Sequence, residues 1–238
     1  MRKSTLISLL SAAALLVSCG PGAESRAGPQ AAGDIAAAPA PAEDFTPPAG
    51  LYKLDPYHAS IVFRADHLGF SFYTGSFAAF DATLNLDPAN LDATEVSAAI
   101  GVPSLRIPAP PEGFFETLMG AAWFNADAHP EISFASTSVT QTGPRTARID
   151  GVMTFLGTRA PLSFDAEFLG GYPGFRPYDP QARIGFTAHG SLNRTDFGLT
   201  EGLPPEGSNM GVADPVSFRI DAEFLGPPAP EAPAAENQ

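Results

Sequence analysis

The side chains best suited to chemistry in this 238-residue chain are four histidines, His58, His67, His129 and His189, and one cysteine, Cys19. A transition-metal site needs three or four ligands with suitable spacing. His58 and His67 bracket an alternating run, and an extended strand would hold them about 30 Å apart. No His-x-His or Glu-x-x-His pattern is present. We therefore predict no metal site and no cofactor.

Nucleophilic catalysis needs a nucleophile, a base and an orienting group in one pocket. The sequence contains no Gly-x-Ser-x-Gly motif. Arg194 and Asp196 are two residues apart, so on a strand they would share a face, and they are expected to form a structural ion pair or to cap a turn. We predict that the protein is not an enzyme.

The amino-terminal region is typical of an export signal. Arg2 and Lys3 precede an apolar run over residues 6–17. This run is too short to span a bilayer, and it indicates a cleaved signal peptide over residues 1–18.

Cys19 follows this segment directly, and Ser18-Cys19 resembles a bacterial lipoprotein processing site. The resemblance implies that Cys19 is lipidated, and two or more acyl chains would anchor the protein stably. The alternative is an ordinary signal peptide with an incidental cysteine. The cysteine is followed by Gly20 and not by aspartate, which resembles lipoproteins that are sorted to the outer membrane. We expect a protein of the bacterial periplasm, lipid-anchored to that membrane.

Composition divides the rest of the chain into three parts. Residues 19–50 and 227–238 are rich in Ala, Pro and Gly and cannot bury enough apolar surface to fold. We expect a disordered tether and a disordered tail there, with one folded domain over residues 51–226. Acidic residues outnumber basic ones by 26 to 13, and no Lys/Arg cluster occurs, which argues against a nucleic-acid partner.

The folded part consists of runs with period two, which predict β-strands. Expected strands cover residues 60–65, 70–87, 96–102, 132–140, 147–156, 160–168, 183–193 and 216–224. The run 70–87 is either a bent strand or a hairpin at Gly75. Residues 113–124 have helical spacing, so one short helix is expected there. Without long crossovers, these eight strands indicate an all-β, antiparallel barrel or sandwich.

The interior of an eight-stranded barrel is either filled by side chains or holds one small ligand. Large and small apolar residues alternate at the inward positions, and 18 phenylalanines stand against one tryptophan. This composition suits a smooth apolar lining and a close-packed core equally well.

Several short motifs occur in a characteristic order: residues 52–58, 62–69, 75–77, 123–126, 129–134, 151–162 and 193–199. This ordered set resembles the YceI-like family, periplasmic lipocalin-like proteins that bind polyisoprenoid lipids. The resemblance covers about residues 50–226. Ala59 stands where the family usually has serine, and Leu156 where it usually has histidine.

The resemblance implies an eight-stranded antiparallel lipocalin-like barrel whose hydrophobic tunnel holds an isoprenoid lipid, polyprenyl or quinone-like, often in a homodimer. The predicted ligand-binding residues are Ile61, Phe63, Ala65, His67, Phe80, Phe134, Phe155, Phe164, Phe186, Arg194, Asp196 and Phe218. Among them, His67, Arg194 and Asp196 would organise the barrel end or contact a head group. If the register of a strand were shifted by one residue, the predicted ligand-binding residues of that strand would point outward.

Three interpretations follow. The leading one is a membrane-tethered carrier of isoprenoid lipid. The second is a structural or stress-response envelope lipoprotein with a solidly packed barrel. The third is an enzyme that acts on an isoprenoid head group.

Overall fold

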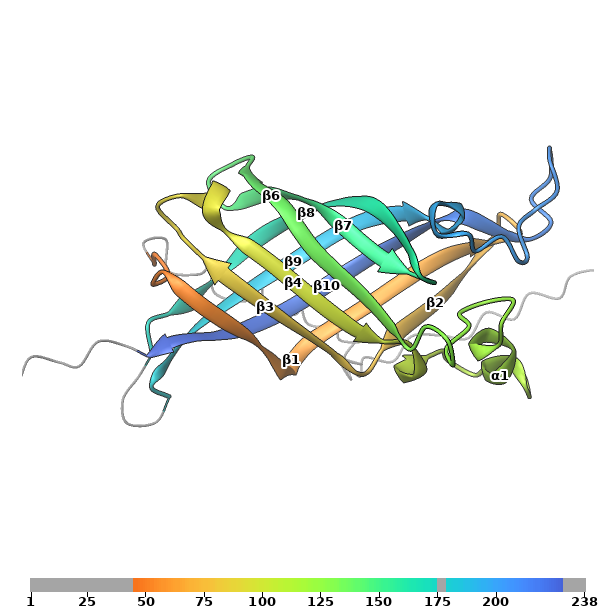
Figure 1. Cartoon of the computed structure of the whole chain (residues 1–238), viewed down its shortest axis with the longest axis horizontal. Coiled ribbons are helices and arrows are strands. Elements are labelled where there is room, and N and C mark those ends of the chain that lie inside the picture. The colour runs from red at the N-terminus through yellow and green to blue at the C-terminus, as the bar shows by residue number, and fades with distance from the viewer. Residues whose placement is uncertain (1–44, 175–178, 229–238) are drawn as a thin grey trace, which may run out of the picture. The chain divides into compact units, whose positions relative to one another are not determined.

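The period-two runs form ten β-strands in the computed structural model, which describes residues 45–174 and 179–228 (Figure 1). The strands are β1 (Gly50–His67), β2 (Ser71–Phe77), β3 (Phe80–Leu86), β4 (Glu95–Gly101), β5 (Leu105–Arg106), β6 (Glu131–Gln141), β7 (Thr146–Phe155), β8 (Thr158–Tyr172), β9 (Gln181–Asn193) and β10 (Val212–Pro228). Three 3₁₀ turns, η1 (Leu91–Ala93), η2 (Val102–Ser104) and η3 (Arg194–Phe197), and the helix α1 (Phe114–Met119) complete the described elements.

The strands close into a ring because β10 pairs with β1, and all pairings are antiparallel. Both β2 and β3 pair with β1, and β5 and β4 pair with β2 and β3 respectively. Strands β2 and β3 therefore share one position in the wall, next to β1. Strands β4 and β5 share the position after it, so the ring has eight positions. This confirms the predicted eight-stranded antiparallel barrel. Residues 70–87 are an interrupted strand, and no hairpin forms at Gly75.

Strand β1 contains a bulge that bends it (Figure 1). Its register with β10 jumps from Leu54↔Phe224 to Ala59↔Ala222, so four residues of β1, 55–58, lie opposite the single residue Glu223 of β10. A bulge of this kind bends a strand and strengthens its twist. The sequence shows Pro56 here, which cannot donate to a ladder hydrogen bond.

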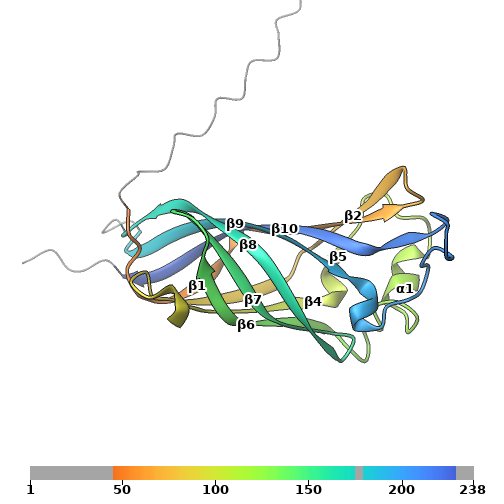
Figure 2. The same cartoon turned by 90° about the horizontal axis from the view of Figure 1, so that it is seen from above.

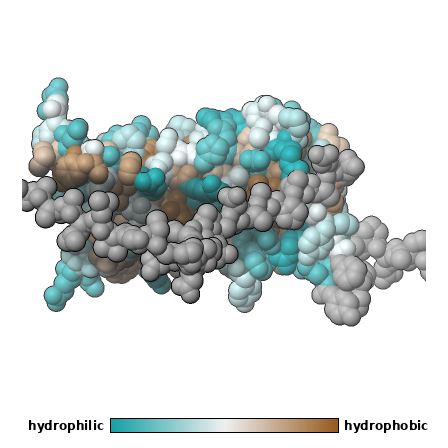
Figure 3. Space-filling view, turned by 180° about the vertical axis from the view of Figure 1, so that it is seen from behind, coloured by the Kyte–Doolittle hydropathy of each residue, from teal (hydrophilic) through white to brown (hydrophobic). Residues whose placement is uncertain are grey.

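The barrel has two different ends. The first end contains the start of β1, the end of β10 and the β3–β4 and β6–β7 turns (Figure 1). At the second end lie the β1–β2 hairpin, α1, η3 and residues 198–211 (Figure 2). Much of the outer surface on the face drawn in Figure 3 is hydrophilic, as expected for wall strands with one face in water.

The predicted helix is shorter than expected, covering six residues in place of 113–124. The Gly120 N–H bonds to the carbonyls of Glu116 and Thr117, which ends the helix, and turns follow. Among the described residues no helix is long and apolar enough to cross a bilayer. The predicted signal peptide, Cys19 and most of the tether and tail lie outside the described residues.

Candidate functional site

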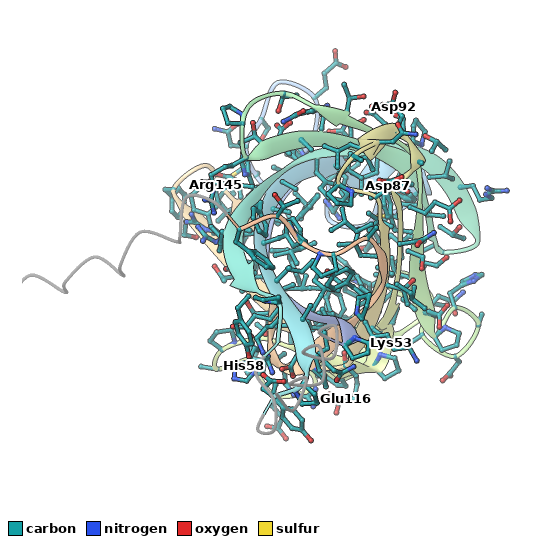
Figure 4. The ribbon with its side chains drawn as sticks, turned by 90° about the vertical axis from the view of Figure 1, so that its left-hand side faces the viewer. Lys53, His58, Asp87, Asp92, Glu116 and Arg145 are labelled. Carbon is teal, nitrogen blue, oxygen red and sulfur yellow. The ribbon has the colours of Figure 1, made fainter. Side chains whose placement is uncertain are left out.

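The barrel encloses an apolar cavity of about 750 Å³. It extends from Phe45 and Arg145 at the first end to Trp123 and Arg194 at the second. Figure 4 looks along the barrel from the first end, where Arg145 and Asp87 lie on different sides of the rim. Sites for small organic ligands usually measure about 300–1,000 Å³. The interpretation of a solidly packed barrel is therefore wrong: the interior is hollow.

The cavity is long as well as large. Val212 and Phe224, near opposite ends of β10, both line it. Twelve residues of strand measure about 40 Å, which corresponds to about 30 Å along the axis of a barrel with strands tilted by about 40°. This shape suits an extended chain better than a compact ligand.

Eleven of the twelve predicted ligand-binding residues line this cavity, since only Asp196 does not. They are Ile61, Phe63, Ala65, His67, Phe80, Phe134, Phe155, Phe164, Phe186, Arg194 and Phe218. The strand members face inward because the ladder registers preserve the alternation of the sequence. Whether these side chains contact a ligand stays a prediction.

The phenylalanine rings lie against the wall because glycines on neighbouring strands leave room for them. Gly190 of β9 is paired with Phe164 on one side and with Phe218 on the other. A Cβ atom at Gly190 would lie 2.7 Å from the Phe218 ring and 2.8 Å from Phe164 Cβ, closer than real Cβ contacts. Across β1 and β2, the Phe63 ring covers Gly75 in the same way.

This row of rings and glycines explains why a barrel with so many phenylalanines is hollow. Phe164 and Phe218 meet edge to face with ring centroids 6.0 Å apart, and Phe134 packs on Phe164 at 5.3 Å. Edge-to-face and tilted pairs are the favourable geometries for aromatic rings. The rings therefore stabilise one another along the wall without crossing the lumen.

At the second end, aromatic side chains from the hairpin and from α1 line the cavity. His67 packs on Tyr73 with centroids 4.7 Å apart, and Tyr73 stacks on Phe114 at 5.9 Å. Leu118 and Trp123 also face the cavity. Their helical spacing is visible in the sequence, but that pattern does not show which space the apolar face covers.

Arg194 organises this end of the barrel and has few donors left for a head group. It is buried, and its guanidinium donates to the carbonyls of Ala213, Glu201 and Val212 at 3.1, 3.1 and 2.8 Å. Burial lowers the pKa of this guanidinium from its ordinary value. The contacts join η3 and residues 198–211 to β10.

The position of Asp196 differs from what its spacing suggests in two respects. Its side chain is exposed and does not line the cavity. It also makes no ion pair with Arg194 among the described residues. Both residues lie in the 3₁₀ turn η3 and not on a strand, so positions two apart do not share a face.

Arg145 also lines the cavity, although no pattern in the sequence predicts it. Its Nε donates to the Phe168 carbonyl at 2.8 Å, and its guanidinium carbon lies 5.1 Å from the centre of the Phe168 ring. Its Nη2 is buried and has no partner among the described residues. A single arginine in a turn gives no signal in the sequence that it faces a cavity.

A second polar cluster lies at the bulge of β1 and does not line the cavity. His58 Nδ1 and Arg183 Nη1 lie 2.9 and 2.6 Å from Asp55 Oδ2, and Arg183 Nη1 also lies 2.7 Å from Glu223 Oε2. Asp55, His58 and Glu223 have ligand atoms close enough together to hold a metal. The guanidinium of Arg183 bonds both carboxylates, however, so the arrangement is a complete ion-pair network.

Fold and cavity together define an antiparallel barrel of the lipocalin-like class. The YceI-like domain matches residues 52–224, so the chain belongs to the YceI-like family. A UPF0312 protein of Pseudomonas putida is 33% identical over 153 residues, covering 63% of this chain and 77% of that protein. Protein YceI of Salmonella arizonae is 33% identical over 159 residues, covering 66% and 80% respectively.

Solved structures show the same fold at low sequence identity. Burkholderia cenocepacia BcnA has a TM-score of 0.59 at 18% identity, covering 71% of this chain and 98% of that one. A polyisoprenoid binding domain from Saccharophagus degradans, implicated in plant cell wall breakdown, has a TM-score of 0.54 at 9% identity, covering 74% and 98%.

Proposed function

We propose that this protein binds and carries an isoprenoid lipid, polyprenyl or quinone-like, in the bacterial cell envelope without transforming it. The observation that carries the proposal is the long apolar cavity of about 750 Å³, whose shape matches an extended chain. The structural likeness to a polyisoprenoid binding domain supports the same ligand class.

Burial of the chain supplies enough free energy for binding. Each isoprene unit moved out of water contributes about 3–4 kcal/mol, counted per carbon group. Micromolar affinity corresponds to about 8 kcal/mol, and loss of motion on association costs at least about 4 kcal/mol. A few buried units therefore suffice, and polar contacts need only orient the ligand.

The polar groups on the cavity support binding more than catalysis. Arg194 already donates to three carbonyls, and Arg145 bonds the Phe168 carbonyl. The His67 ring packs on the ring of Tyr73. Its imidazole has no hydrogen bond to a hydroxyl or carboxylate among the described residues. An enzyme acting on a head group would need such a partner.

The envelope location is part of the proposal and rests on the sequence before residue 45. Lipidated Cys19 would tether the barrel to a membrane, and homodimer formation is expected from the family resemblance. Replacement Cys19→Ser should release the protein from the membrane fraction. Continued sedimentation of the variant with membranes would contradict a lipid tether.

Native mass spectrometry of the protein purified from membranes tests the ligand. We expect a retained hydrophobic adduct that denaturation releases and whose fragments show isoprenoid spacing. Protein that carries no adduct and takes up no added geranylgeraniol would contradict the proposal. Consumption of an added quinone would favour the enzyme instead.

A further inference from the structure

Next to β1, the wall of the barrel has a place where no strand ladder joins this strand to its neighbours β2 and β3. β3 pairs with β1 as far as Lys53↔Thr83, and β2 pairs with β1 from Ile61↔Phe77 onward. Residues 54–60 of β1 have no partner in either ladder. We call the boundary between residues 54–60 and the β2–β3 break the seam.

The backbone on the far side of the seam is bonded away from β1. The Ala78 N–H donates to the Ser104 carbonyl at 3.1 Å, and the Gly101 N–H donates to the Ala79 carbonyl at 2.9 Å. The β2–β3 break is thus fixed to η2 and the end of β4. On the other side, the bulge of β1 carries Pro56, which has no N–H to offer.

A recess of about 310 Å³ lies over the seam on the outside of the barrel. Exposed residues of β1 and of the β2–β3 break line it, among them Pro56, Ser60 and Ala78. Three of its lining residues, Ile61, Phe77 and Phe80, also line the interior cavity. At the seam, these apolar side chains stand between the outside recess and the lumen.

The two ends of the barrel are the alternative routes. At the second end, Phe114, Leu118 and Trp123 face the cavity from α1 and the turns after it. At the first end, Phe45, Thr46 and Pro47 face it. At the seam, rotation of the side chains breaks no backbone pairing of the β1–β2 or the β1–β3 ladder.

We propose that the seam is a lateral portal through which the apolar chain of the ligand enters and leaves the barrel. Phe77, Phe80 and Ile61 form its gate. The inference rests on the proposed function and adds the route by which the lipid reaches the cavity.

Stopped-flow uptake of retinol, a fluorescent isoprenoid probe, tests the portal. The variant Ala78→Trp fills the recess from an exposed position that does not line the cavity. The matched control Ala135→Trp makes the same change at an exposed position on β6. We expect Ala78→Trp to slow both uptake and release about tenfold at unchanged Kd, because a blocked route changes both rates equally. The control should keep the wild-type rates.

Two further variants keep the test decisive if Ala78→Trp fails to fold. Ser60→Trp fills the same recess from β1 and should also slow both rates. Phe80→Ala shortens a gate residue and should accelerate both. Unchanged rates in the folded variants would overturn the portal and place the route at an end of the barrel. Failure of the wild-type protein to bind retinol or geranylgeraniol would instead contradict the proposed function, and the portal with it.

Discussion

Arg183 Nη1 lies 2.6 Å from Asp55 Oδ2, so the guanidinium on β9 joins a carboxylate that precedes it by 128 residues. Asp55 is buried, and its side chain is 6% exposed. The pair connects the bulge of β1 with β9, and Glu223 of β10 lies between these strands in the ring. This network holds the bent part of β1 against the wall.

Replacement Arg183→Met should destabilise the fold by about 3 kcal/mol, because it removes the guanidinium from the buried Asp55 carboxylate and leaves His58 as its remaining side-chain partner. The control is Arg219→Met, whose partner Asp221 lies on the same strand and is also exposed. Exposed pairs contribute less than about 1 kcal/mol. Urea unfolding measures both, and equal losses would contradict a structural role for Arg183.

The same network predicts how stability depends on pH. The hydrogen bond from His58, and after it that from Arg183, lowers the pKa of Asp55 from 3.8 to about 2. A carboxyl group with a lowered folded pKa stabilises the fold fully above its unfolded pKa and loses this contribution as pH falls toward its folded pKa. The difference in stability between wild type and Asp55→Asn should therefore be constant above about pH 4 and shrink between pH 4 and 2. Unfolding curves across this range check it, and a constant difference would contradict it.

Gly190→Ala should destabilise the barrel by about 1–3 kcal/mol, as overpacking does. Its Cβ atom would collide with Phe218 and Phe164. The control Gly185→Ala lies on the same strand, where the nearest atom to a new Cβ is 4.0 Å away. In thermal melts we expect Gly190→Ala to lower the Tm by several degrees, since 1 kcal/mol corresponds to about 2–4 °C at this size. Equal melting of both variants would show that the rings move aside freely.

Ala98→Phe should block the lumen, because Ala98 lines the cavity in the middle of β4. Ala99→Phe is the control, since the next residue of the strand faces away from the cavity. We expect Ala98→Phe to weaken retinol binding at least about tenfold, through lost volume, while Ala99→Phe keeps the wild-type Kd. Equal affinities would show that the ligand does not occupy this level of the barrel.

The wall of the barrel could be predicted from the sequence because period-two alternation directly specifies strands with one buried face. The inward positions of Phe63, Phe164 and Phe218 follow from that alternation. The state of the interior did not follow, since composition suits a filled and a hollow barrel equally. Gly75 and Gly190 leave room for phenylalanine rings at the wall, which favours the hollow barrel. Their effect depends on which phenylalanine is paired opposite each glycine.

The polar sites were harder to predict because they depend on contacts distant in sequence. Spacing suggested an ion pair or a turn cap at Arg194 and Asp196. The two residues lie in the 3₁₀ turn η3, where Arg194 is buried and Asp196 is exposed. The contact of Asp55 with Arg183 requires the register of three neighbouring strands. The bulge itself is hinted at only by Pro56.

The glycines of the wall have a consequence for the diversity of such barrels. Gly75 and Gly190 do not line the cavity, yet they set where the phenylalanine rings rest. A larger residue at either position would push a ring toward the barrel axis and narrow the bore. Selectivity for the width of a ligand can therefore diverge between relatives whose lining residues are identical.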